Sequence, residues 1–193
     1  MRLQRITLRE QAGILVTRRL GEKVRQNILA ALDRNAEPTS LLLDFNEIRI
    51  LDYSCADELV SRLAIELQSR LYGQYFLLLT GLDDMIHENI AVALKQREIA
   101  LLCEREQQWH VIGSLRPYIE QGLSLLNNER VITSRELADV EGISINAACN
   151  RMNELCRMGL AYRNPGPPLS GGKIFQYISI LPQEEAMAET AGA

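Results

Sequence analysis

Residues 133–160 read TSRELADVEGISINAACNRMNELCRMGL, and this stretch decides the fold of the last third of the chain. Thr133 and Glu136 have the spacing of a capping box, which predicts that a short helix begins here. Gly142 then permits a left-handed turn, and Ser144 can cap a second helix. The stretch therefore predicts two short helices joined by a tight turn.

The second of these helices is expected to have a buried side. Ile145, Ala148, Met152 and Leu155 recur at helical spacing and predict an apolar stripe. Gly159-Leu160 ends the helix. Strand-like segments follow at Tyr162-Arg163 and at 173–180, and the Pro- and Gly-rich residues 164–172 between them predict the tip of a hairpin.

This arrangement resembles the winged helix-turn-helix domains of bacterial regulators of the MarR and GntR types. The resemblance covers about fifty residues, within 131–181. It rests on Leu137-Ala138, Gly142-Ile143-Ser144, Ala147-Ala148, Arg151, Leu155 and Gly159-Leu160.

The resemblance to winged helix-turn-helix domains implies a DNA-binding site on the second helix. Its residues in the major groove would be Ser144, Asn146, Ala147, Asn150 and Arg151. Three further residues, Arg135, Arg163 and Lys173, would hold phosphates and so position the helix without reading sequence. Useful specificity requires two copies, so a homodimer is expected. The alternative is that this domain binds protein, and the whole chain is a non-enzymatic adaptor.

The first 112 residues alternate between strand-like and helix-like segments. This alternation predicts an α/β (α+β) fold, with a mixed sheet and helices mainly on one face. Strands are expected at 6–8, 14–17, 41–45, 75–80, 99–104 and 109–112, with a turn at 11–13. Helices are expected at 21–35, at 83–97 and around the stripe Cys55, Leu59, Leu63 and Leu67.

Residues 42–59, LLDFNEIRILDYSCADEL, resemble the strand, turn and helix of STAS domains, the fold of anti-sigma-factor antagonists. The similarity is closest to a STAS-like subfamily with a Gly-Glu motif in the first helix, here Gly21-Glu22. Ser54-Cys55-Ala56-Asp57-Glu58-Leu59 matches the helix start of that subfamily, although Cys55 stands where STAS domains usually have glycine. The resemblance covers roughly residues 14–112.

The STAS resemblance implies a protein partner and a regulatory serine. In phospho-regulated STAS proteins, a kinase of the GHKL ATPase type phosphorylates the serine that Ser54 matches. Phosphate at a helix start is favoured by the helix dipole. Ser54 and Asp57 also have the spacing of a plain capping box, which needs no phosphate, and the two roles are compatible.

Composition and charge fit a cytoplasmic regulator. Apolar residues make up 47% of the chain, charged residues 24%, and the net charge is −4, which argues against nonspecific coating of nucleic acid. The segment 114–181 carries seven basic and six acidic residues and is the only non-negative part. No apolar run is long enough to span a membrane, and no secretion signal is recognisable.

Enzyme chemistry is not expected. No phosphate-binding glycine loop and no Ser-His-Asp or Cys-His arrangement is recognisable, and neither a cofactor nor a metal site is predicted. The four cysteines are interpreted as buried free thiols. The expected organisation is a STAS-like domain at 1–112, a linker helix at 113–130, a winged helix-turn-helix at 131–181 and a disordered tail at 182–193.

Overall fold

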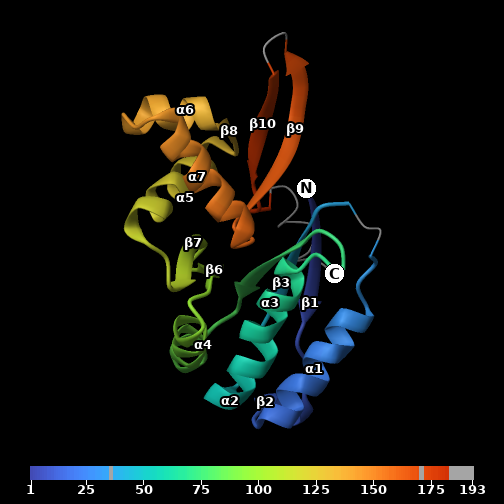
Figure 1. Cartoon of the computed structure of the whole chain (residues 1–193). Helices are drawn as coiled ribbons and strands as arrows, with labels where there is room; N and C mark the ends of the chain where they lie inside the picture. The colour runs from blue at the N-terminus through green and yellow to red at the C-terminus, as the bar shows by residue number, and fades with distance from the viewer. Residues whose placement is uncertain (35–36, 170–171, 183–193) are drawn as a thin grey trace. The chain divides into compact units, whose positions relative to one another are not determined.

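The computed structural model of this chain describes residues 1–34, 37–169 and 172–182, with the backbone alone for 165–169 and 172–174. The chain folds into two compact units, Met1–Ser114 and Leu115–Leu181 (Figure 1). The tail that the sequence predicts to be disordered lies outside the described residues beyond Pro182.

The first unit is built on a mixed sheet, as the sequence predicts, and this sheet has five strands. Its strands have the order β1-β3-β5-β6-β7, in which the first four are parallel and β7 is antiparallel to β6. The strands are β1 (Arg2–Thr7), β3 (Thr39–Asp44), β5 (Tyr75–Thr80), β6 (Ala100–Arg105) and β7 (Gln108–Gly113).

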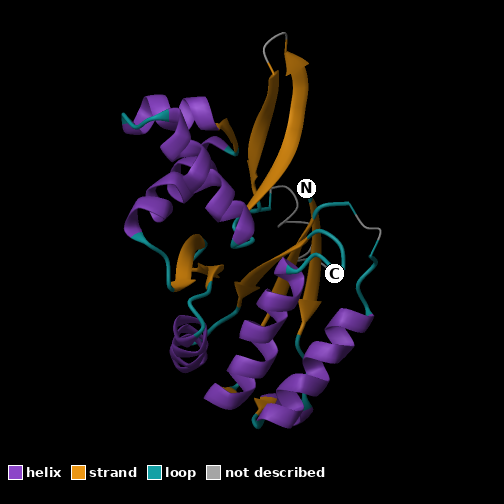
Figure 2. Ribbon diagram, viewed as in Figure 1, coloured by secondary structure: helices purple, strands orange, loops and turns teal. Residues whose placement is uncertain are grey.

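The helices of the first unit pack on one face of this sheet (Figure 2). They are α1 (Arg18–Ala30), α2 (Tyr53–Ala56), the π-helical turn Asp57–Ser61, α3 (Arg62–Gln68) and α4 (Asp84–Gln96). Successive strand residues point to opposite faces, and Leu41, Leu43, Leu77 and Leu79 share one core with these helices. The intervening Leu42 and Leu78 are also buried, so the central strands are apolar on both faces.

The strands expected on either side of the turn at 11–13 do not pair with each other. Instead, β1 pairs with β3, while β2 (Ile14–Leu15) pairs in parallel with β4 (Ile50–Leu51). Between β1 and β2 the chain forms a short 3-10 helix, Gln11–Gly13. A Cβ on Gly13 would lie 2.6 Å from the Glu47 carbonyl oxygen, so the approach of these loops requires glycine.

Gly21 sets the contact between α1 and α2. A Cβ there would meet the carbonyl oxygen of Cys55 at 2.9 Å and its Cα at 3.2 Å. The glycine of the Gly-Glu motif therefore allows two helix backbones to touch. The neighbouring Glu22 is exposed.

The second unit contains three helices and a three-stranded antiparallel sheet of order β8-β10-β9. Its elements in chain order are α5 (Pro117–Glu129), β8 (Val131–Thr133), α6 (Ser134–Glu141), α7 (Ile145–Arg157), β9 (Ala161–Leu169) and β10 (Gly172–Ser179). The predicted apolar stripe of α7 is confirmed at Ala148, Met152 and Leu155, which are buried.

The local signals around α6 and α7 are confirmed. Thr133 and Glu136 form both hydrogen bonds of a capping box, and Gly142 adopts a left-handed conformation with φ 64°. The hydroxyl of Ser144 accepts a hydrogen bond from the Ala147 N–H and so caps α7.

The stretch that the sequence assigns to a linker helix is an integral part of the second unit. It forms α5, whose residues Ile119, Leu123 and Leu126 are buried. Ser179 also donates its backbone N–H to the Arg130 carbonyl oxygen, and its hydroxyl donates to Asn127. The sequence correctly predicts an amphipathic helix here, but the apolar side of this helix is buried in the second unit and the helix is not a linker. Among the described residues, no helix is long and apolar enough to cross a lipid bilayer.

Candidate functional site

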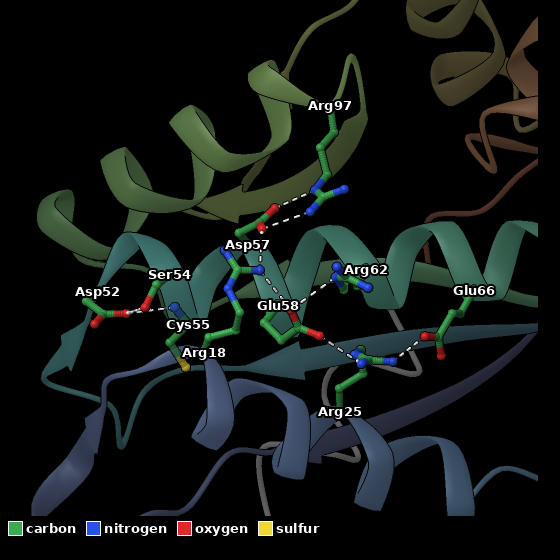
Figure 3. A network of polar contacts seen from close by, with 10 residues as sticks. All are labelled: Arg18, Arg25, Asp52, Ser54, Cys55, Asp57, Glu58, Arg62, Glu66 and Arg97. Carbon is green, nitrogen blue, oxygen red and sulfur yellow. Dashed lines mark hydrogen bonds and ion pairs between the residues drawn. The ribbon is translucent and has the colours of Figure 1, made fainter.

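Ser54 is the second residue of the helix that begins at Tyr53, and Asp52 is its cap. Asp52 Oδ1 accepts a hydrogen bond from the Cys55 N–H at 2.7 Å and another from the Ser54 hydroxyl at 3.0 Å. The predicted capping box formed by Ser54 and Asp57 is therefore wrong, because the cap lies two residues earlier. Ser54 is half-buried, and its hydroxyl points toward a carboxylate (Figure 3).

Asp52 also joins the starts of two helices. Its Oδ2 accepts the backbone N–H of Thr17, the cap of α1, at 3.0 Å. Thr17 has φ 77°, a conformation that is strained for a β-branched residue. Burial opposes ionisation of Asp52, but the hydrogen bonds from Thr17, Cys55 and Ser54 outweigh it and lower its pKa. The charged carboxylate thus holds α1 and α2 together.

One helical turn after Ser54, two adjacent carboxylates are buried at the centre of a charged cluster. We call this cluster the carboxylate–arginine network; its members are Arg18, Arg25, Asp57, Glu58, Arg62, Glu66 and Arg97 (Figure 3). It contains four positive and three negative side chains, so it carries one uncompensated positive charge.

Asp57 binds two arginines that lie far from it in sequence. Arg97, just beyond α4, donates from Nε to Oδ1 and from Nη2 to Oδ2, the latter at 2.9 Å. Arg18 of α1 donates to the same Oδ2 at 3.1 Å. The Arg97 hydrogen bonds are the main reason that the pKa of Asp57 lies below its ordinary value.

Glu58 binds three arginines. Arg25 donates to Oε1 at 2.9 Å, while Arg18 and Arg62 approach Oε2 at 2.9 and 3.0 Å. Only 5% of the Arg25 side chain is exposed, and its second partner is Glu66. Burying a charge is tolerable only when it is paired, so Glu58 is the residue that makes a buried Arg25 possible.

The network lies on an irregular turn of helix. Residues Asp57–Ser61 form a π-helical turn, a rare conformation that often occurs at functional sites. Within the described residues, three buried polar atoms near it have no hydrogen-bond partner: Arg25 Nε, Ser61 Oγ and Glu66 Oε2. Meanwhile Arg18 and Arg62 leave 52% and 47% of their side chains exposed. The buried acids therefore hold two guanidinium groups at the surface.

The second candidate site is the outer face of α7. Asn146 and Asn150, both predicted from the sequence, are exposed, as is the cap residue Ser144, and Ala147 is half-buried. Asn153 is also exposed and lies on this face, although the sequence reasoning did not select it. Its position seven residues after Asn146 was the available signal.

Arg151 does not join this face. Its Nη1 pairs with Glu141 of α6, its guanidinium lies 5.2 Å from the centre of the Tyr118 ring, and only 17% of its side chain is exposed. The side chain is therefore engaged in holding α5, α6 and α7 together.

Two of the three residues expected to hold phosphates are exposed. Arg135, in the first turn of α6, and Arg163, on β9, are both exposed. Arg163 donates to Asn153 Oδ1 at 3.1 Å and stacks 4.6 Å from the centre of the Phe175 ring. The side chain of Lys173 lies outside the described part of the chain.

The cysteines divide into two classes, and none of the four forms a disulfide in the described part of the chain. Cys55 and Cys103 are buried, and burial raises the pKa of Cys55 to about 12. Cys149 and Cys156 on α7 are only half-buried, which corrects the expectation that all four are buried. Within the described residues, no group of three or more His, Cys, Asp and Glu side chains is arranged to hold a metal ion.

No model of a known protein family matches this chain, and no curated protein matches it closely enough to count as a relative. The two sites therefore rest on their own geometry.

Proposed function

We propose that this chain is a DNA-binding transcriptional regulator. In this proposal the second unit is a winged helix-turn-helix, and the first is a STAS-like domain that binds a protein partner. The observation that best supports it is the exposed asparagine face of α7, which follows a capped helix and a glycine turn. The sheet order β8-β10-β9 is consistent with a hairpin that flanks this helix as a wing.

The exposed amides of α7 suit base reading. Asparagine amides carry both a donor and an acceptor, and base edges in the major groove present both. Arg135 and Arg163 are exposed, and we assign them to the phosphates. We remove Arg151 from the base-reading set and assign it a supporting role, because its charge is paired with Glu141.

A salt titration tests the DNA proposal. Binding of fluorescent genomic fragments to the full chain is measured between about 50 and 200 mM salt, where phosphate contacts weaken steeply. Arg135→Ala is expected to lower the affinity and to reduce the salt slope by about 0.9, the value for one phosphate contact. Arg9→Ala is the control, because it removes the same charge from an exposed ion pair in the first unit.

The adaptor function is the second candidate, and one observation favours it. Val140 on α6 and Ile145 at the start of α7 are 67% and 50% exposed, and exposed apolar side chains suit a protein partner better than DNA. Absence of DNA binding even at the lowest salt would support the adaptor and exclude the regulator.

We further propose that the first unit binds a GHKL-type ATPase that phosphorylates Ser54. The half-buried hydroxyl lies one turn before Asp57, so an added phosphate would stand beside two buried carboxylates and the half-exposed Arg18. New charge at this position would compete for Arg18 and alter the contact of α1 with α2.

Intact-mass measurement tests this switch. Co-expression of the full chain with a GHKL-type serine kinase is expected to add one phosphoryl group, which Ser54→Ala abolishes and Ser69→Ala does not. An unchanged mass beside an active kinase would remove the switch from the proposal. The homodimer is a further part of the proposal, and light scattering of the full chain with and without DNA measures its mass.

A further inference from the structure

Three asparagines form a single stripe on α7. An α-helix turns about 100° per residue, so Asn146, Asn150 and Asn153 fall within a sector of about 60°. All three are exposed, and the buried Ala148, Met152 and Leu155 lie on the other side of the helix. The exposed Arg157 continues this sector at the end of α7, where it pairs with Glu154 at 3.3 Å, so the three amides are the uncharged part of the face.

The amides of the stripe are not equivalent. Asn153 Oδ1 already accepts a hydrogen bond from Arg163 at 3.1 Å, and Arg163 is itself fixed by stacking on Phe175. This bond occupies one of the two lone pairs of Asn153 Oδ1 and orients the amide toward Arg163. Among the described residues, the amides of Asn146 and Asn150 form no hydrogen bond with another side chain, so each keeps an adjacent donor and acceptor.

We infer that α7 reads adenine through Asn146 and Asn150; this rests on the proposed function, namely that the second unit binds duplex DNA. In the major groove, adenine presents the N7 acceptor beside the N6 donor. One asparagine amide matches this pair, with Nδ2 donating to N7 and Oδ1 accepting from N6–H. Asn153 is already oriented by its hydrogen bond from Arg163, so we assign no base to it.

The spacing along the helix gives the spacing of the two adenines. Four residues advance an α-helix by about 6 Å, and base pairs are stacked about 3.4 Å apart. A helix lying along the groove therefore places the adenines roughly two base pairs apart. The free amides at Asn146 and Asn150 are thus expected to recognise A-N-A or its equivalent across strands.

Atomic substitution in the DNA tests the assignment. The bound site is first selected from a random duplex pool with the full chain. Each adenine in it is then replaced by 7-deazaadenine, which keeps N6 and lacks the N7 acceptor. We expect at least a fivefold loss of affinity at two adenines separated by about two base pairs, from the usual size of a bidentate contact.

Two variants connect each loss to its residue. Asn150→Ala is expected to bind the natural and the substituted duplex equally at one of these adenines, and Asn146→Ala at the other. Asn153→Ala is the matched control, because it shortens the same side chain on the same face and should keep both losses. All three positions are exposed, and circular dichroism checks that each variant is folded.

The outcomes separate this inference from the proposed function. Selected duplexes without paired adenines, or a site insensitive to 7-deazaadenine, would overturn the adenine assignment while the chain remains a DNA-binding protein. If no duplex is retained even at low salt, both the DNA-binding proposal and the assignment are overturned.

Discussion

Glu58→Gln is expected to destabilise the first unit by far more than a surface substitution does. The change keeps the shape of the side chain but removes the charge that Arg18, Arg25 and Arg62 share. Arg18 and Arg62 can turn to solvent, so each accounts for less than about 1 kcal/mol. Arg25 cannot, because only 5% of its side chain is exposed and Glu66 is its one remaining partner.

The expected loss is about 3–4 kcal/mol of unfolding free energy, the lower part of the usual range for removing one partner of a buried ion pair, because Arg25 keeps its pair with Glu66. The chain has a single tryptophan, Trp109 on β7, so its fluorescence reports the first unit alone. Urea is the denaturant of choice, because it leaves the ion pairs unscreened. With a slope of about 2 kcal/mol per molar urea, the midpoint should fall by about 2 M.

Two comparisons make the result decisive. Glu47→Gln breaks the exposed pair with Arg9 and should change stability by less than about 1 kcal/mol. The double variant Arg25→Met with Glu58→Leu removes both buried charges and should recover most of the loss. Two results would refute the role of the buried Arg25 charge. One is that Glu58→Gln lowers the unfolding free energy no more than Glu47→Gln does, and the other is that the double variant is no more stable than Glu58→Gln.

Three further predictions concern other parts of the chain. Gly21→Ala should lower the thermal midpoint, because its Cβ would meet the Cys55 backbone at 2.9 Å. Gly122→Ala is the matched control, because its Cβ would meet only side-chain atoms at 3.7 Å or more, and it should raise the midpoint through better helix propensity. A lower midpoint in both would show that the close approach is not responsible. The depressed pKa of Asp57 adds stability that is present above its unfolded pKa of about 4 and is lost as pH falls further. Between about pH 5 and 3, the urea midpoint of Asp57→Asn should therefore fall less than the urea midpoint of the wild-type protein. Parallel pH curves for the two proteins would contradict this. Native protein should react with a thiol reagent only at Cys149 and Cys156, and at all four cysteines in urea, as peptide mapping will show; labelling of Cys55 in the folded state would contradict its burial.

Much of the fold could be predicted from the sequence, because strong local signals decide it. The capping box at Thr133, the turn at Gly142 and the buried strand Tyr75–Thr80 all lie where local chemistry places them. The connections around 11–17 could not be predicted, since strand pairing depends on partners distant in sequence. In the structure, β1 pairs with β3, whose residues lie more than thirty positions later in the sequence.

The helix after Tyr53 shows a signal that was present but not interpreted. Cys55, Leu59, Leu63 and Leu67 repeat every four residues, whereas an α-helix repeats every 3.6, so three steps would rotate the stripe by about 120°. All four are nevertheless buried, because the π-helical turn inserts about one extra residue and restores the alignment. A strict spacing of four therefore predicts such a turn.

The candidate sites were only partly predictable, because sequence shows which residues share a face but not what that face meets. Arg151 and Asn150 are neighbours in sequence, yet Arg151 forms an ion pair with Glu141 and Asn150 is exposed. The buried network had a weaker signal. Arg25 lies on the apolar face of α1 with Ile28 and Leu29, and a charge there requires an acidic partner on the opposing helix.

The two units use polar side chains in opposite ways, and this bears on how the chain would bind DNA. In the first unit, the arginines of the carboxylate–arginine network pair with buried carboxylates, while α7 in the second unit presents three exposed amides beside the exposed Arg157. If Arg135, Arg163 and Lys173 each contact one phosphate, the salt slope is only about −2.7 per copy, so nonspecific attachment is weak. Affinity must then come mostly from base contacts and from pairing two copies. Such a protein would occupy its own site without coating other DNA.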